Sequence, residues 1–320
     1  MKHSHTVLYL FAFVVIVYAP FTGSVELRPV EILRSGSIAS TLFFSVRLPH
    51  EVLTFFAGFI LALGGLVFQN IFRNALMTPY TLGISSGAVF GAGVALRLGL
   101  GTAFFGISLV EIFGFFGAFF SVVLILYLAR FLRHNDTVSL LLLGIALSLF
   151  YTSSLMVLFY LGDSVQNDIL LRYSMGSLSV VGWESPLIVL FCAAVYMSMV
   201  YLYRYELEFM AISSEYAMQK GVSTKKVTYI LLVVSSFAVG VLISITGPVG
   251  FVGLVVPHIV AKIYRCTLSY RLFVTAFFGG VFLVVCDMLS RILQTQSELP
   301  IGIVTAFVGA PFFIYLIVKK

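Results

Sequence analysis

Residues 247–258 read GPVGFVGLVVPH, an almost wholly apolar stretch. It contains three glycines, two prolines and one histidine: Gly247, Pro248, Gly250, Gly253, Pro257 and His258. A buried β-strand would not accept two prolines, and a helix break at membrane depth is tolerated only where the backbone lines a cavity or is buried in protein. We therefore expect Gly247 and Pro248 to reverse the chain at the outer face. The segment then re-enters as a distorted helix, in which Pro257 frees a carbonyl one turn earlier.

The composition of the chain is that of an integral membrane protein. Hydrophobic residues make up 60% of its 320 residues, charged residues make up 10%, and the mean hydropathy is +1.09. Soluble domains carry about 25% charged residues. The apolar runs are long and continuous, which indicates helices and not the alternating strands of a barrel. We expect a single transmembrane domain over 1–320 with about ten spans, at 7–23, 51–69, 79–98, 104–130, 138–161, 184–204, 226–246, 249–264, 272–293 and 301–318.

The charges between the spans predict the orientation. With the N-terminus in the cytoplasm, thirteen of the nineteen lysine and arginine residues fall on the inside. The other six lie outside: Arg28, Arg34, Arg47, Arg97, Arg172 and Arg291. This asymmetry fits the positive-inside rule and places both termini in the cytoplasm. The first span starts like a signal peptide, but no small-residue cleavage site follows it, so we expect it to be retained.

Small residues recur along the third predicted span. They fall at every fourth position, at Gly83, Gly87, Gly91, Ala95 and Gly99. Gly58 and Ala62 repeat this spacing in the second span. Such faces let helices approach closely in lipid, where burial of apolar surface no longer drives association.

Two connections are more than simple loops. The outer connection, 162–183, is too polar to span the membrane and is expected to form a short helix at the external mouth. The inner connection, 205–225, is the longest cytoplasmic one. There Ser213 or Ser214 can cap a short helix, and Gly221 can end it in a left-handed conformation. Its exposed apolar residues fit either a lipid surface or a docking partner, and the sequence favours neither.

Several classes of function are excluded by missing patterns. The histidines and cysteines show no zinc spacing or disulfide framework, and the positive charges are too scattered for nucleic-acid binding. The sequence has no GxxxxGK[ST] loop, so the chain cannot cradle ATP phosphates itself. His258 has no second histidine or paired carboxylate beside it, which favours a hydrogen-bonded histidine over a proton relay or metal ligand.

Five motifs, in order from about residue 46 to 318, are similar to those of the FecCD-type permeases. GPVGFVGLVVPH is one of them. The others are VRLPH at 46–50, GGLVFQNIFRNALMTPYTLGISSGA at 64–88, MGSLSVVGW at 175–183, and CDMLSRI at 286–292 followed by ELPIGIVTAFVGAPFFIYLI at 298–317. Departures lie on the cytoplasmic side. Ala75-Leu76-Met77 replaces the family's Pro-Leu-Ala, Ala261 replaces an arginine, and Lys220-Gly221-Val222 replaces Leu-Gly-Val. The turn Arg265–Arg271 also departs from the family pattern, and these changes put in doubt only the fine contacts with an ATPase.

The resemblance implies an all-α type II ABC importer permease with ATP used by a partner. Such a permease works beside a second permease, most simply a copy of itself, with two cytoplasmic ATPase subunits and an external substrate-binding protein. The implied location is a bacterial-type inner membrane, with lipid around the helices. The implied substrate is a metal chelate, most commonly an iron–siderophore, with haem or cobalamin as the alternative. The resemblance implies no bound cofactor.

The resemblance also assigns roles to individual residues. Binding-protein docking falls to Arg47, His50 and Arg291, with the alternative that Arg291 pairs locally with Asp287. His50 stands where the family has arginine, which would make docking partly pH-dependent. Contact with the ATPase falls to the inner connection, at Ser214, Glu215, Ala217, Lys220 and Gly221.

The resemblance implies a translocation path between the two permeases, lined partly by the fifth and tenth spans. Its candidate residues are the hydroxyls of the fifth span, Ser148 and Thr152, and those at its cytoplasmic start, Thr137 and Ser139. Alternatively, these hydroxyls bond to carbonyls of their own helix. A secondary transporter would need intramembrane ionisable pairs or an internal repeat, and a membrane enzyme would need a catalytic constellation. The sequence shows neither pattern.

Overall fold

The computed structural model describes residues 2–23, 29–32, 37–100, 103–104, 107–131, 137–264, 266–293 and 299–318. Arg28, Arg34 and Arg265, which entered the predictions above, lie outside these residues. The elements, in chain order, are α1 (Lys2–Tyr18), η1 (Ala19–Phe21), α2 (Pro29–Ile32), α3 (Ile38–Leu42), the π turn η2 (Phe43–Arg47), α4 (Leu48–Phe72), η3 (Pro79–Leu82), α5 (Ile84–Arg97), β1 (Ala103–Phe104), β2 (Ile107–Ser108), α6 (Leu109–Ala129), α7 (Thr137–Leu161), α8 (Ser164–Met175), α9 (Glu184–Leu202), α10 (Arg204–Ile212), α11 (Ser214–Gln219), α12 (Thr224–Thr246), α13 (Val252–Ile263), α14 (Leu268–Ile292) and α15 (Ile301–Val318). The two short strands pair antiparallel.

The apolar helices match the ten predicted spans. Six helices in the described residues are long and apolar enough to cross a membrane, and four shorter apolar helices accompany them. The second span is longer than predicted, because α3, η2 and α4 run on as one helical stretch, Ile38–Phe72. The predicted all-α membrane fold is therefore confirmed.

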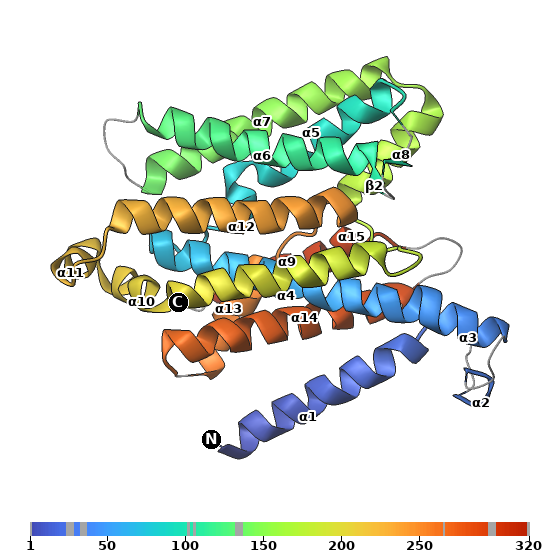
Figure 1. Ribbon diagram of the computed structural model, residues 1–320, viewed down its shortest axis with the longest axis horizontal. Helices are drawn as coiled ribbons and strands as arrows, with labels where there is room; N and C mark the ends of the chain where they lie inside the picture. The colour runs from blue at the N-terminus through green and yellow to red at the C-terminus, as the bar shows by residue number, and fades with distance from the viewer. Residues whose placement is uncertain are drawn as a thin grey trace.

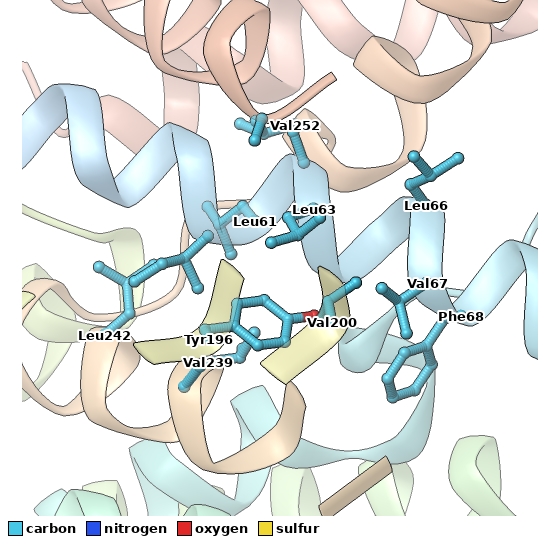
Figure 2. Packing of buried hydrophobic residues seen from close by; sticks show 14 of the residues in the cluster. Leu61, Leu63, Leu66, Val67, Phe68, Tyr196, Val200, Val239, Leu242 and Val252 are labelled. Atoms are coloured by element: carbon cyan, nitrogen blue, oxygen red, sulfur yellow. The ribbon is translucent and has the colours of Figure 1, made fainter. Parts of the chain in front are cut away.

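Helix α4 lies at the centre of the fold (Figure 1). It packs against α14, α13, α9 and α12, and 78% of the most apolar part of its span is buried. Figure 2 shows Tyr196 of α9 among apolar side chains of α4 and α12, and its hydroxyl donates to Ser235 Oγ at 2.8 Å, or accepts from it.

Glycines allow the backbones to approach at the seams of α4. A Cβ added to Gly58 would lie 2.2 Å from the Gly279 carbonyl oxygen of α14, and one added to Gly65 would lie 1.7 Å from that of Gly253 in α13. Neither position has room for a side chain. The close packing predicted at Gly58 is thus confirmed.

The glycine ladder of α5 packs on α6 through its central members. A Cβ added to Gly87 or Gly91 would come within 2.7 or 2.2 Å of a carbonyl oxygen of α6. The glycines at the two ends of the ladder do not make this contact with α6. Gly83 adopts a left-handed conformation between η3 and α5, and Gly99 has open space around its Cα.

The two unusual connections lie at opposite ends of the molecule (Figure 1). Helix α8 forms the predicted helix within 162–183, and α10 and α11 form the connection within 205–225. Both termini lie at the end that carries α10 and α11.

Candidate functional site

The chain reverses at the segment with which the sequence analysis began. Helix α12 ends at Thr246, Gly247 takes a φ of +66°, and α13 begins at Val252. The intervening backbone is held by Tyr80, whose hydroxyl accepts a hydrogen bond from the Val249 amide at 2.9 Å. The predicted turn at Gly247 and Pro248 is therefore present, and an element far away in sequence fixes it.

Pro257 lies inside α13 and leaves the carbonyl of Gly253 without its usual helical donor. The side chain of Gln69 on α4 supplies the missing bond, with Nε2 3.2 Å from that oxygen. This is the carbonyl that the sequence predicted to be free. Gln69 belongs to the motif at 64–88, but nothing in that motif indicated its partner.

A second proline, at the start of α4, also leaves a carbonyl without its helical donor. Pro49 cannot donate to the carbonyl of Ser45, which instead accepts from the Gly182 amide at 2.8 Å. The indole of Trp183 donates to the neighbouring Phe44 carbonyl at 3.0 Å. The motif at 175–183 thus satisfies the carbonyls opened where η2 joins α4.

The backbones of three elements approach closely where the external mouth is predicted. A Cβ added to Gly176, after α8, would lie 2.5 Å from the Pro248 carbonyl oxygen. One added to Gly302 of α15 would lie 2.2 Å from that of Met175. The Ser177 amide donates to the Thr246 carbonyl at 2.7 Å. The reversal, α8 and the start of α15 therefore form one unit.

His258 lies half-buried in α13, where Nδ1 donates to the Leu254 carbonyl at 2.7 Å. The residue is thus the hydrogen-bonded histidine that the sequence favoured.

Gly250, also of this motif, lines a groove of about 640 Å³ along α15, together with Pro248 and Phe307.

Five ionisable residues gather at the ends of α4 and α14 that are predicted to lie outside, and we call them the outer charge cluster: Arg47, His50, Glu51, Asp287 and Arg291. Arg291 Nη2 donates to Glu51 Oε1 at 2.6 Å and also to Asp287 Oδ2. His50 Nε2 lies 3.0 Å from Asp287 Oδ2. The local Arg291–Asp287 pair considered from the sequence is therefore present.

Both arginines of the outer charge cluster also hold the backbone before α2. Arg47 Nη1 donates to the carbonyls of Pro20 at 3.2 Å and Thr22 at 2.9 Å, and Arg291 Nη1 donates to Thr22 at 3.2 Å. These bonds tie the end of the first span to the two central helices.

All three predicted docking residues line one cavity of about 510 Å³, which we call the outer pocket. The structure thus brings Arg47, His50 and Arg291 together, although they are largely buried and already have partners within the chain. Sequence reasoning missed Glu51. It is an acid in an apolar span, and its partner is 240 residues away.

Helix α7 carries the predicted path residues. Ser148 Oγ donates to the Gly144 carbonyl at 2.9 Å, and Thr152 Oγ1 donates to the Ser148 carbonyl at 2.8 Å. Ser139 is half-buried, and the side chain of Thr137 lies outside the described part. The two central hydroxyls therefore bond to their own helix, the alternative considered above, while 17% of the span's most apolar part is buried.

The inner connection forms two short helices. Ser213 caps α11 by accepting from the Tyr216 amide at 2.9 Å, so Ser214 is the first helical residue. Glu215 and Lys220 are exposed, whereas Ala217 is fully buried. Gly221 ends the helix with the predicted left-handed φ, +81°. Only part of the predicted coupling set is therefore on the surface of the chain.

Comparison with known proteins places these features in one family. The profile of the FecCD transport family matches residues 10–319. An ABC transporter permease protein of Methanocaldococcus jannaschii is 33% identical over 87% of this chain and 82% of its own. An iron chelatin transport system permease protein of Helicobacter pylori is 29% identical over 88% and 84%. A vitamin B12 import system permease protein of Serratia proteamaculans is 31% identical over 96% and 90%.

A solved structure shares the whole fold. It is an inward-facing metal-chelate type ABC transporter, with a TM-score of 0.86, 25% sequence identity and full coverage of both chains.

Proposed function

The chain belongs to the FecCD transport family and is a membrane-spanning ABC transporter permease, and from this premise we propose that it imports a metal chelate, most closely an iron–siderophore. The observation that carries the proposal is the full-length similarity to a metal-chelate type transporter. The similarity to a permease named for iron chelatin favours iron. The similarity to a vitamin B12 permease makes cobalamin an alternative, and the similarity to a permease named for hemin transport makes haem another.

We propose that the energy comes from a separate ATPase that binds α10 and α11. Glu215 of α11 and Lys220, which directly follows α11, are exposed and offer charges of both signs, while buried Ala217 keeps the helix packed on its own chain. ATP is used by that partner, and this chain needs no cofactor of its own.

We propose that an external binding protein docks at the outer pocket. Arg47 and Arg291 line it and would attract carboxylates, since charge complementarity steers association and fixes register. His50 lines the same pocket, with Nε2 3.0 Å from Asp287 Oδ2.

The proposed path runs between this chain and a second copy, along α7 and α15. Helix α7 exposes most of its span, and the groove along α15 is bordered by Pro248 and Gly250 of the reversal. Ser148 and Thr152 direct their hydroxyls to their own backbone, so they would present a weakly interacting face on which a large chelate is not held. Thr137 and Ser139 would stand at the inner end.

The proposed setting is the inner membrane of a bacterial-type cell, with both termini in the cytoplasm and lipid around the exposed helices. The positive-inside asymmetry supports this orientation. So does the position of both termini beside α10 and α11 (Figure 1).

ATP-dependent uptake in proteoliposomes tests the proposal. The permease, its ATPase and its binding protein are offered iron-loaded siderophores, haem and cobalamin in parallel. We expect uptake of an iron–siderophore, lost when the ATPase cannot hydrolyse ATP. Uptake of haem or cobalamin alone would replace the proposed substrate. An intact, ATP-hydrolysing complex that takes up none of the three would refute the metal-chelate proposal.

A further inference from the structure

Arg291 lines the outer pocket and also pairs with Glu51, a residue that does not line the pocket. Arg291 lines the pocket, whereas Glu51 is absent from its lining and is 8% exposed. Glu51 Oε1 nevertheless lies 2.6 Å from Arg291 Nη2. The Arg291 guanidinium therefore binds a buried carboxylate and also faces the pocket that an external ligand would enter.

Arg291 is already occupied within the chain. Its Nη2 faces both Glu51 and Asp287, and its Nη1 donates to the Thr22 carbonyl. A carboxylate entering the pocket must therefore compete with an internal carboxylate for the same nitrogen. Arginine's planar fork binds a carboxylate best when two nitrogens are available, so this competition weakens the incoming contact.

Glu51 is held less firmly than Asp287. Asp287 Oδ2 has His50 Nε2 at 3.0 Å in addition to Arg291. Glu51 Oε1 has Arg291 alone, and its second oxygen, Oε2, is buried with no hydrogen-bond partner among the described residues. Exchange at Arg291 therefore replaces Glu51 more easily than Asp287.

The charges around the pocket also indicate that Glu51 would oppose the binding of a carboxylate. Arg47 and Arg291 carry two positive charges, and Glu51 and Asp287 carry two negative ones. The formal charges of these four side chains cancel, although three arginines and one aspartate line the pocket. Arg172, which also lines the pocket, is paired with Asp168 at 2.9 Å. Removing Glu51 alone would leave a net positive site.

We propose that Glu51 is an internal competitor that weakens docking of the external binding protein. Its carboxylate occupies Arg291 until a carboxylate of the binding protein replaces it, and it returns when that protein leaves. Docking is thereby reversible, as repeated delivery requires. The inference rests on the docking role proposed above and adds a residue with the opposite effect on affinity.

The test measures binding, not uptake. The complete transporter with its ATPase subunits is placed in nanodiscs, and the affinity of its binding protein is measured for wild type, Glu51→Gln and Glu51→Asp. We expect Glu51→Gln to lower Kd about fivefold, which corresponds to about 1 kcal/mol of binding free energy. Glu51→Asp keeps the charge but shortens the side chain. It should also lower Kd if contact with Arg291, and not net charge, is what competes.

The matched control is Glu111→Gln. Glu111 lies at the outer end of α6, where it accepts from the Ser108 amide at 3.3 Å. Glutamine can keep this capping bond, so the substitution removes one outer negative charge with little effect on structure. We expect Kd to stay at the wild-type value.

A Kd for Glu51→Gln that is unchanged, raised, or lowered only as much as for Glu111→Gln would overturn the inference, provided that the variant complex hydrolyses ATP normally. If Glu51→Gln does not assemble, Glu51→Asp decides in its place. Absence of binding to the wild type and to every variant would instead refute the docking proposal itself, and the inference with it.

Discussion

Replacing Gln69 with leucine should destabilise the protein by breaking one bond between α4 and α13. In the native chain, Gln69 Nε2 donates to the Gly253 carbonyl across 3.2 Å. That oxygen lacks its helical donor because residue 257 is proline. Leucine has a similar volume to glutamine but no donor. The variant therefore leaves a carbonyl unsatisfied without opening a large cavity.

The expected cost is about 1–2 kcal/mol. An unsatisfied buried acceptor costs about 1–3 kcal/mol, and interhelical hydrogen bonds in membrane proteins average about 0.6 kcal/mol, with an upper value near 1.7. Pro257→Ala provides the decisive background, because alanine supplies the main-chain N–H that Gly253 lacks. In that background, Gln69→Leu should cost about 1 kcal/mol less than in the wild type.

The wild type, Gln69→Leu, Pro257→Ala and the double variant form a double-mutant cycle. Their free energies of unfolding are compared by equilibrium unfolding in mixed micelles. Asn70→Leu is the matched control. Asn70 Nδ2 donates to the Leu66 carbonyl at 2.7 Å, an oxygen within the same helix. Its loss should cost about 0.5 kcal/mol or less, because the main chain already satisfies that carbonyl. If the two substitutions change the free energy of unfolding additively, the Gln69 bond does not depend on the donor that Pro257 removes, and the argument is refuted.

Two further changes test the packing and the charges. Gly65→Ala should prevent stable assembly of α4 on α13 and cost at least about 3 kcal/mol, since the new Cβ would fall 1.7 Å from the Gly253 carbonyl oxygen; a thermal melt within a few degrees of wild type would contradict this. Arg291→Ala should cost about 3–5 kcal/mol by leaving the buried Glu51 carboxylate without its arginine, whereas Arg172→Ala, whose ion-paired side chain is 62% exposed, should cost less than about 1 kcal/mol. Equal unfolding free energies for these two variants would rule out the outer charge cluster as a stabilising unit.

The spans could be predicted from the sequence because each is set by local composition. The lipid solvent imposes a minimum length of apolar helix, so the runs at 138–161 and 272–293 appear as α7 and α14. The reversal at Gly247 was predictable for the same reason, since glycine and proline act on their own backbone. Capping of α11 was predicted as Ser213 or Ser214, and only the local geometry selects Ser213.

The pairings across the fold could not be predicted, because they depend on residues far apart in the chain. Glu51 meets Arg291 across 240 positions, and Gln69 meets Gly253 across 184. Periodicity specifies which face of a helix is apolar, but it does not specify which neighbour that face meets. The structure brings the three predicted docking residues to one pocket, but the acid that pairs with Arg291 was not predicted.

The two proline sites explain how those neighbours become specific. Pro49 and Pro257 each create an acceptor that lipid cannot satisfy, and each acceptor is met from another element, by Gly182 and by Gln69. Any alternative packing of the same apolar helices would leave these carbonyls unpaired. Prolines that weaken single helices therefore select one arrangement of the bundle.

This arrangement makes α4 a link between the two faces of the protein. Glu51 at its outer end joins the outer charge cluster, and Gln69 lies eighteen residues further along, about 27 Å away at 1.5 Å per residue. The helix between them is buried and closely packed against α14 at Gly58 and against α13 at Gly65. A helix so confined cannot bend locally without breaking those contacts, because close-packed interiors resist deformation. Under the docking proposed above, displacement of the outer end of α4 should therefore move α13 with it, because the Gln69–Gly253 bond and the close packing of Gly65 on Gly253 join the two helices.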